Sequence, residues 1–150
     1  MKKHNLLMWV LCAALLAGLA GCSGRDDYAR ILEENWGFSM PEAMGYSECY
    51  EKNTETSFQG DGLRYHVFSY ENAEPVETLV RWEKTPHKTI FFDSCRAAAS
   101  MWTDELEVPK EWKPDYEACV FWYQAREDDS ELLVFHDPQR KLLYVVESFL

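Results

Sequence analysis

Residues 116–149, YEACVFWYQAREDDSELLVFHDPQRKLLYVVESF, decide the fold class. Runs rich in aromatic and branched side chains alternate here with short polar segments, and such runs favour β-strands. The polar segments 126–130 and 137–140 have the length and composition of hairpin turns. The sequence therefore predicts an antiparallel meander with strands at 116–125, 131–136 and 141–149.

A second pair of strands precedes the meander. Residues 46–58 are polar and rich in β-forming side chains, and the glycine-containing segment 59–62 has the composition of a turn. In residues 63–70, Leu63, Tyr65 and Val67 alternate with Arg64 and His66, as in a half-buried strand. This hairpin and the meander together predict one antiparallel sheet of about five strands.

Helical periodicity occupies much of the remaining chain. Residues 27–36 place Tyr28, Leu32 and Trp36 on one helical face, and Gly37 follows as a left-handed stop. Residues 94–106 repeat apolar side chains at three- and four-residue steps, with Trp102 among them. Shorter helices are expected at 40–44 and, with Pro75 in the first turn, at 75–83. All of these helices are expected to pack on one face of the sheet, giving a single α+β domain over residues 27–150.

The N-terminus has the parts of a secretory signal. Lys2 and Lys3 precede an apolar run at 6–20, which is short of the roughly 20 residues that a membrane-spanning helix needs. The end of the run and the residues after it read LCAALLAGLAGCSG, residues 11–24. Residues 19–22 of this segment are Leu-Ala-Gly-Cys. An ordinary signal peptide with a chance cysteine, or an apolar anchor helix, would also contain such a run.

The Leu-Ala-Gly-Cys ending resembles the lipobox of bacterial lipoproteins. That resemblance implies that residues 1–21 are removed as a signal peptide and that Cys22 receives a diacylglyceryl group. It also implies a membrane-anchored domain on the extracytoplasmic face of the cell membrane, with residues 22–26 as a short tether. Two acyl chains are needed because each buried CH₂ contributes only about 0.8 kcal/mol, so a single chain anchors weakly.

A second resemblance lies in the segment Trp36-Gly37-Phe38-Ser39-Met40-Pro41 followed by residues 58–70, FQGDGLRYHVFSY. Together these segments are similar to a group of small exported proteins of Gram-positive bacteria. The resemblance implies export, and it carries no activity.

The charge balance restricts the partners. The formal net charge is −11, and the signal segment contains lysines but no acids, so the exported domain is more acidic still. Nucleic-acid binding requires cationic side chains that replace phosphate counterions, and this composition argues against it. The same charge argues against docking on anionic lipid headgroups. The expected partners are the membrane, through Cys22, and an extracytoplasmic protein or peptide.

Three cysteines remain beyond Cys22: Cys49, Cys95 and Cys119. Their odd number leaves at least one unpaired, and no CxxC spacing supports a zinc knuckle or a thioredoxin-like redox site. We expect buried, unpaired thiols, because free cysteine in apolar surroundings behaves as a small hydrophobe. One disulfide and a reactive cysteine are the open alternatives.

Candidate ligand contacts lie beside the glycines of the first hairpin. Gly60 and Gly62 would let a ligand approach the backbone, with Asp61, Arg64 and His66 next to it. The competing interpretation is a plain hairpin turn, since neither a P-loop nor a dinucleotide fingerprint is present. The sequence predicts no catalytic residue, no metal ligand and no cofactor.

Other polar groups have structural explanations. His66, His87 and His136 do not stand at helical ligand spacing, and His136 opens a turn in which the following Asp137 would bond its own backbone. The acidic run 127–129 lacks the spacing of a calcium loop.

Two functions follow from these observations. The first is a lipid-anchored binding module for a protein, peptide or envelope component. The second is a small hydrolase or metal-dependent enzyme that uses His66 or His136 with nearby carboxylates. Convergence of histidine and carboxylate in one pocket would favour the enzyme, and an exposed aromatic patch would favour the module.

Overall fold

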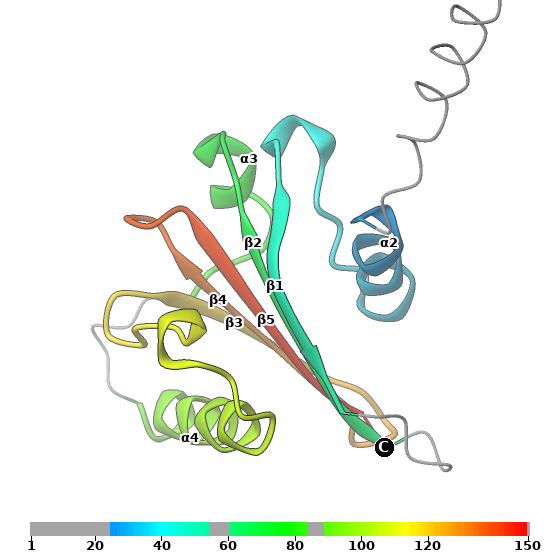
Figure 1. Cartoon of the computed structure of the whole chain (residues 1–150), viewed down its shortest axis with the longest axis vertical. Helices are drawn as coiled ribbons and strands as arrows, with labels where there is room; N and C mark the ends of the chain where they lie inside the picture. The colour runs from blue at the N-terminus through cyan, green and yellow to red at the C-terminus, as the bar shows by residue number, and fades with distance from the viewer. Residues whose placement is uncertain (1–24, 55–60, 84–88, 150) are drawn as a thin grey trace, which may run out of the picture.

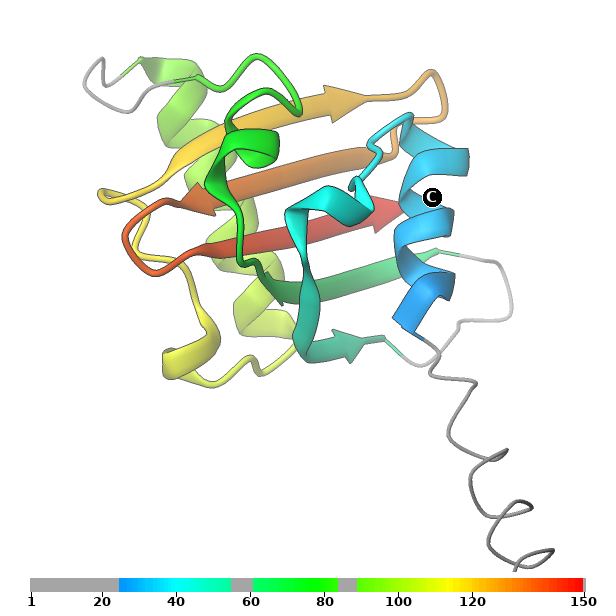
Figure 2. The ribbon, with the colours of Figure 1, turned by 90° about the horizontal axis from the view of Figure 1, so that it is seen from above.

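Five antiparallel strands form one sheet in the computed structural model, which describes residues 25–54, 61–83 and 89–149. The strands are β1 (Ser47–Asn53), β2 (Gly62–Ser69), β3 (Val120–Ala125), β4 (Glu131–Asp137) and β5 (Leu142–Phe149). Their order across the sheet is β1-β2-β5-β4-β3, so the N-terminal hairpin joins the C-terminal meander through β2 and β5 (Figure 2). The predicted α+β fold with a five-stranded antiparallel sheet is confirmed.

Two longer helices lie on opposite sides of this sheet. They are α2 (Arg25–Trp36) and α4 (Ile90–Glu105), and Figure 1 shows the sheet between them. The shorter helical segments are η1 (Glu42–Met44), α3 (Ala73–Glu77) and η2 (Lys110–Trp112). Within the described residues, none of the helices has the length and hydropathy needed to cross a bilayer.

The expectation that the helices cover a single face was therefore wrong. The physical reason is visible in β4 and β5, where residues 132–137 and 142–147 are buried without a break rather than at every second position. Successive side chains of a strand point to opposite faces, so a continuous buried run needs cover on both. The sequence of these strands is apolar almost without a break, which is the pattern of a strand covered on both faces. The same pattern is also read as a strand with one buried face and a few additional apolar residues.

Two separate apolar clusters provide the cover. On the α4 face, Trp102, Phe92 and Cys95 of the helix pack over Tyr65, Phe135 and other strand residues. On the α2 face, Leu32 and Trp36 pack with residues of the 38–46 segment over Phe68, Val134 and Val145. The assignment of Trp102 to the face of its helix that meets the sheet is thus confirmed.

Helix boundaries are set by local chemistry. α4 begins at Ile90, earlier than the expected 94, because the Thr89 hydroxyl accepts a hydrogen bond from the Phe92 amide and caps the first turn. α2 ends at Trp36, and Gly37 follows at φ 67°, the left-handed conformation that the sequence predicted there. α3 ends at Glu77, well short of the predicted 83.

The strand β1 contains a β-bulge. Glu48 lies opposite Phe68 and Tyr50 lies opposite Val67, so Cys49 is an additional residue without a partner in the register. A bulge reverses the alternation of side chains from that point onward. Glu48 and Glu51, three residues apart, therefore point to the same face of the sheet.

The cysteines follow from this placement. Within the described residues no disulfide joins Cys49, Cys95 and Cys119, and Cys95 and Cys119 are buried as expected. Cys49 is exposed, which corrects the expectation of burial for that residue. The reason is that it occupies the bulge of an edge strand, which has a neighbouring strand on one side only.

Candidate functional site

Buried polar side chains gather on the α2 face of the sheet. His66 of β2 shares this face with Phe68 and Tyr70, and Glu147 of β5 shares it with Leu143 and Val145, because alternate residues of a strand point the same way. His66 is 3% exposed and Glu147 is 1% exposed. Ionisable groups this deeply buried require partners, and the partners define the site.

His66 is held between a carboxylate and an aromatic ring. Its Nδ1 lies 2.5 Å from Oε1 of Glu48, and its imidazole stacks on the ring of Tyr28 with 3.3 Å between ring centroids. Its Nε2 is buried and has no hydrogen-bond partner in the part of the chain that the structure describes. The imidazole is thus fixed by one nitrogen and one face.

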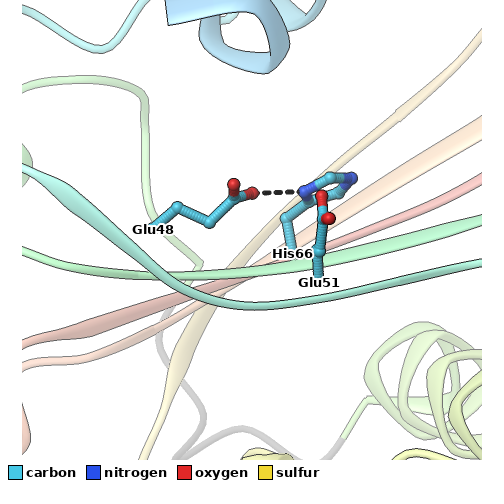
Figure 3. Close-up of side chains that lie close together, drawn as sticks. All are labelled: Glu48, Glu51 and His66. Atoms are coloured by element: carbon cyan, nitrogen blue, oxygen red, sulfur yellow. Dashed lines mark hydrogen bonds and ion pairs between the residues drawn. The ribbon is translucent and has the colours of Figure 1, made fainter. Parts of the chain in front are cut away.

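Burial lowers the pKa of His66 to about 4; the carboxylates of Glu51 and Glu147 oppose this shift, and Arg64 adds to it. His66 is therefore neutral at pH 7, and a neutral imidazole with its proton on Nδ1 donates a hydrogen bond to Glu48. We call Glu48, Glu51 and His66 the acid–histidine cluster. One possible ligand atom from each member lies within 4.8 Å of the others (Figure 3).

Glu147 fastens α2 to the sheet beside this cluster. The Tyr28 hydroxyl donates to its Oε2 at 2.7 Å, and the Trp36 indole N–H donates to its Oε1 at 2.5 Å. The Arg64 guanidinium lies 3.8 Å from Oε2 and partly balances the buried charge. Burial, followed by the charge of Glu147, raises the pKa of Tyr28 well above its ordinary range, so the phenol remains a donor.

The sequence identified part of this region. Arg64 and His66, two of the predicted ligand contacts, lie on the α2 face and contact Glu147 and Glu48 respectively. Asp61, the third, is exposed just before β2, and the acid–histidine cluster is built without it.

The sequence analysis did not identify Glu48 and Glu51 as neighbours of His66. Their convergence depends on the bulge, and no pattern in the sequence predicts a bulge at this position. Glu147 carried a usable signal: it is a charge at the end of the apolar run 142–146.

His136 occupies a different place on the same face. It lies opposite Leu143 in the register, whereas His66 lies opposite Val145, and β5 runs between them. Its Nε2 is 2.7 Å from the Tyr70 hydroxyl, and its Nδ1 is buried without a hydrogen-bond partner among residues 25–54, 61–83 and 89–149. Burial lowers its pKa, with Asp137 opposing the shift. The structure therefore does not bring the two histidines together.

A pocket of about 610 Å³ adjoins His136. Trp82, Val80, Val120 and Pro138 supply apolar walls, and Glu77 and Arg81 supply charge. Asp137 has the predicted turn role: its Oδ1 accepts hydrogen bonds from the amides of Gln139 and Arg140 at 3.0 Å each.

The acidic hairpin tip between β3 and β4 is also explained by turn chemistry. Asp128 accepts a hydrogen bond from the Ser130 amide at 3.1 Å and pairs with Arg126 at 3.3 Å. Hydrogen bonds from Ser130 lower the pKa of the Asp128 carboxyl.

Besides the acid–histidine cluster and the pocket beside His136, a third candidate site is an exposed apolar surface on α4. Ile90, Phe91 and Met101 are 88%, 50% and 60% exposed, and they are the large hydrophobic side chains left exposed among the described residues. A groove of about 280 Å³ runs beside Phe91, between α4 and the strands β3 and β4. We call these three residues, with the exposed Ala97 between them, the α4 outer face.

Cys22, the predicted lipidation site, lies outside the described residues. Comparisons with known protein families, with curated proteins and with solved structures found no match. Function must therefore be argued from the domain itself.

Proposed function

We propose that the protein is a lipid-anchored, extracytoplasmic binding module, held at the membrane through Cys22, that binds an apolar protein segment on the α4 outer face. The observation that carries this proposal is the collection of Ile90, Phe91 and Met101 on one helix. Contiguous exposed apolar side chains are uncommon on monomeric proteins and mark interaction sites.

The two sides of α4 show why these exposed apolar residues are not needed to cover the sheet. Phe92, Cys95, Ala99 and Trp102 already fill its buried side. Ile90, Ala97 and Met101 recur at the spacing of the opposite side, so they form a second apolar stripe. A helix that needed only to cover the sheet would have polar side chains on that stripe. Burial against a second partner would account for this stripe.

Charge at the rim describes that partner further. Asp93, Asp104, Glu105 and Glu117 are exposed around the helix. Two cations, Arg96 and Lys113, pair with three of these four acids, so the rim keeps an excess of negative charge. The net charge of −11 has the same sign. The chemistry therefore favours an apolar segment flanked by basic residues, since complementary rim charges steer association and fix orientation.

The enzyme alternative has less support. His66 does meet carboxylates, but its imidazole is 3% exposed and stacked under Tyr28, which keeps substrate-sized molecules from it. His136 lies at a pocket, and its Nε2 is engaged by Tyr70.

Peptide binding tests the proposal. Two synthetic peptides with the same leucine-rich core, one flanked by lysines and one by glutamates, are compared by fluorescence anisotropy. We expect the lysine-flanked peptide to bind more tightly than the glutamate-flanked peptide. Its affinity should fall as the salt concentration rises, because salt screens interactions between exposed charges. Ile90→Glu and Met101→Glu should each weaken it at least about tenfold, as expected for a central apolar contact.

Gln139→Glu is the matched control, because it adds the same charge at an exposed turn. Equal binding of both peptides, or unchanged binding in both α4 variants, would overturn the proposed surface.

The anchor is tested separately. Cys22→Ala should abolish incorporation of labelled fatty acid and leave the precursor uncleaved. Release of the same soluble form by wild type and variant would refute the lipoprotein assignment without bearing on the α4 outer face.

A further inference from the structure

We propose that the acid–histidine cluster, Glu48, Glu51 and His66, binds a divalent first-row transition-metal cation, with Zn²⁺ as the representative ion. The site lies at the β1 edge of the α2 face and is separate from the α4 outer face. Its ligand set is two carboxylates and one imidazole, all within 4.8 Å of one another.

The β-bulge constructs the ligand set. In a regular strand Glu48 and Glu51 would point to opposite faces, but the extra residue Cys49 turns both toward His66. Glu51 lies directly opposite His66 in the register, and Glu48 lies opposite Phe68, the next residue on that face. Bulges are over-represented where a strand re-aims a side chain at a functional site.

The imidazole is held ready to act as a ligand. Tyr28 stacks on the imidazole and fixes the plane of the ring. Nδ1 points at Glu48, as Figure 3 shows. Nε2, although buried, has no hydrogen-bond partner among the described residues. None of these residues locks the tautomer from that side, so Nε2 can carry the ring proton while Nδ1 offers its lone pair to a cation.

Electrostatics favour a cation at this position. Two carboxylates converge here and the buried carboxylate of Glu147 lies nearby, whereas the adjacent cation, Arg64, is already placed against Glu147 and over the Phe149 ring. A bound divalent ion would offset this concentration of negative charge. Glu51 is exposed and the Glu48 side chain is 21% exposed, so the cation can enter from solvent.

The ligand chemistry selects the ion. Ca²⁺ and Mg²⁺ prefer all-oxygen sites, whereas imidazole with carboxylates suits Zn²⁺ and its neighbours. Tetrahedral coordination at bond lengths of about 2.0–2.2 Å places the ligand atoms roughly 3.3–3.6 Å apart. The Nδ1 atom of His66 and the Oε1 atom of Glu48 therefore have to separate from 2.5 Å, and the exposed Glu51 side chain has to approach by rotation. Three protein ligands leave a coordination position for water or for a group from a partner.

The test uses full-length protein purified in detergent, stripped of metal with EDTA and titrated with Zn²⁺ by calorimetry. All proteins carry Cys49→Ser, because the exposed thiol beside the cluster could bind Zn²⁺ independently. We expect one Zn²⁺ per chain, and Glu51→Gln and His66→Gln should each weaken binding at least about tenfold, as the loss of a ligand requires. Co²⁺ in the same protein should give visible absorption that Glu51→Gln removes.

Glu127→Gln, in the exposed acidic hairpin tip, is the control and should leave binding unchanged. Since Glu51 is exposed, its variant keeps the fold even if His66→Gln does not, and circular dichroism verifies this. Equal Zn²⁺ affinity in Glu51→Gln and the control, absence of Zn²⁺ binding, or displacement of Zn²⁺ by millimolar Ca²⁺ would each overturn the proposal.

Discussion

Beneath α4 the sheet is covered by aromatic and aliphatic side chains, whereas beneath α2 the same strands carry two buried histidines and a buried glutamate. The α4 face is held by shape and area: Phe92, Ala99 and Trp102 fit over Tyr65 and Phe135. The α2 face adds directed bonds, since Tyr28 and Trp36 each donate to one oxygen of Glu147.

The difference shows two ways of fixing a helix on a sheet. Apolar packing supplies most of the free energy of folding and is non-directional, so it tolerates small shifts of the helix. A buried carboxylate with two donors tolerates few shifts, because each displaced donor would be left unsatisfied. We therefore expect α4 to contribute more to stability and α2 to be more exactly positioned, next to the cluster that Tyr28 orders.

The largest effect should come from the α4 face. Trp102→Ala removes a buried indole and should lower the free energy of unfolding by roughly 3–5 kcal/mol, measured by urea unfolding with circular dichroism. Met101→Ala, on the opposite side of the same helix, is the control and should change it by less than about 0.5 kcal/mol. Similar losses for both would mean that the two sides of α4 are assigned wrongly.

A somewhat smaller effect should come from the directed bonds of the α2 face. Glu147→Gln keeps the size of the side chain but removes the charge that accepts from Tyr28 and Trp36, and should cost roughly 2–3 kcal/mol. Trp36 fluorescence should also shift as its indole N–H loses a charged acceptor. Glu127→Gln serves as the exposed control, and a cost no larger than that of the control would show that packing alone positions α2.

The third effect is a pH dependence confined to the α2 face. Burial holds the folded pKa of His66 at about 4, against an ordinary value of 6.5 in the unfolded chain. Between these values the unfolded state binds more protons, so stability is full above pH 6.5 and falls as the pH is lowered toward 4. Between pH 7 and pH 5 this contribution should be roughly 1–2 kcal/mol.

His66→Gln, compared with the parent protein in EDTA by urea unfolding at each pH, should flatten this dependence. A remaining slope of the same sign is expected from His136, whose pKa burial also lowers. An unchanged profile in the variant would show that His66 is not the group that titrates.

The smallest effect concerns the cysteines and leaves stability unchanged. Cys49 is exposed, whereas burial raises the pKa of Cys95 to about 11 and that of Cys119 to about 12, which suppresses their reactive thiolates. Alkylation at pH 7, followed by intact mass, should add one label to the folded domain at Cys49 and none in Cys49→Ser. Rapid labelling of Cys95 in the folded protein would show that the α4 face opens readily.

The sequence by itself determined the strands, their antiparallel hairpins and the buried side of α4. These features are local: a period of two, a period of about 3.6 and short polar turns specify them within a few residues. It also indicated that residues 1–22 form a signal with a lipidation site, which stays a prediction.

Only the tertiary structure decided that helices cover both faces, that Cys49 is exposed, and that Glu48 and Glu51 meet His66. Each of these depends on how β1 pairs with β2 and on what lies above a strand, which are interactions between segments far apart in the chain. A single extra residue in one strand reverses the direction of every later side chain, so the chemistry of the edge was set by pairing and not by composition.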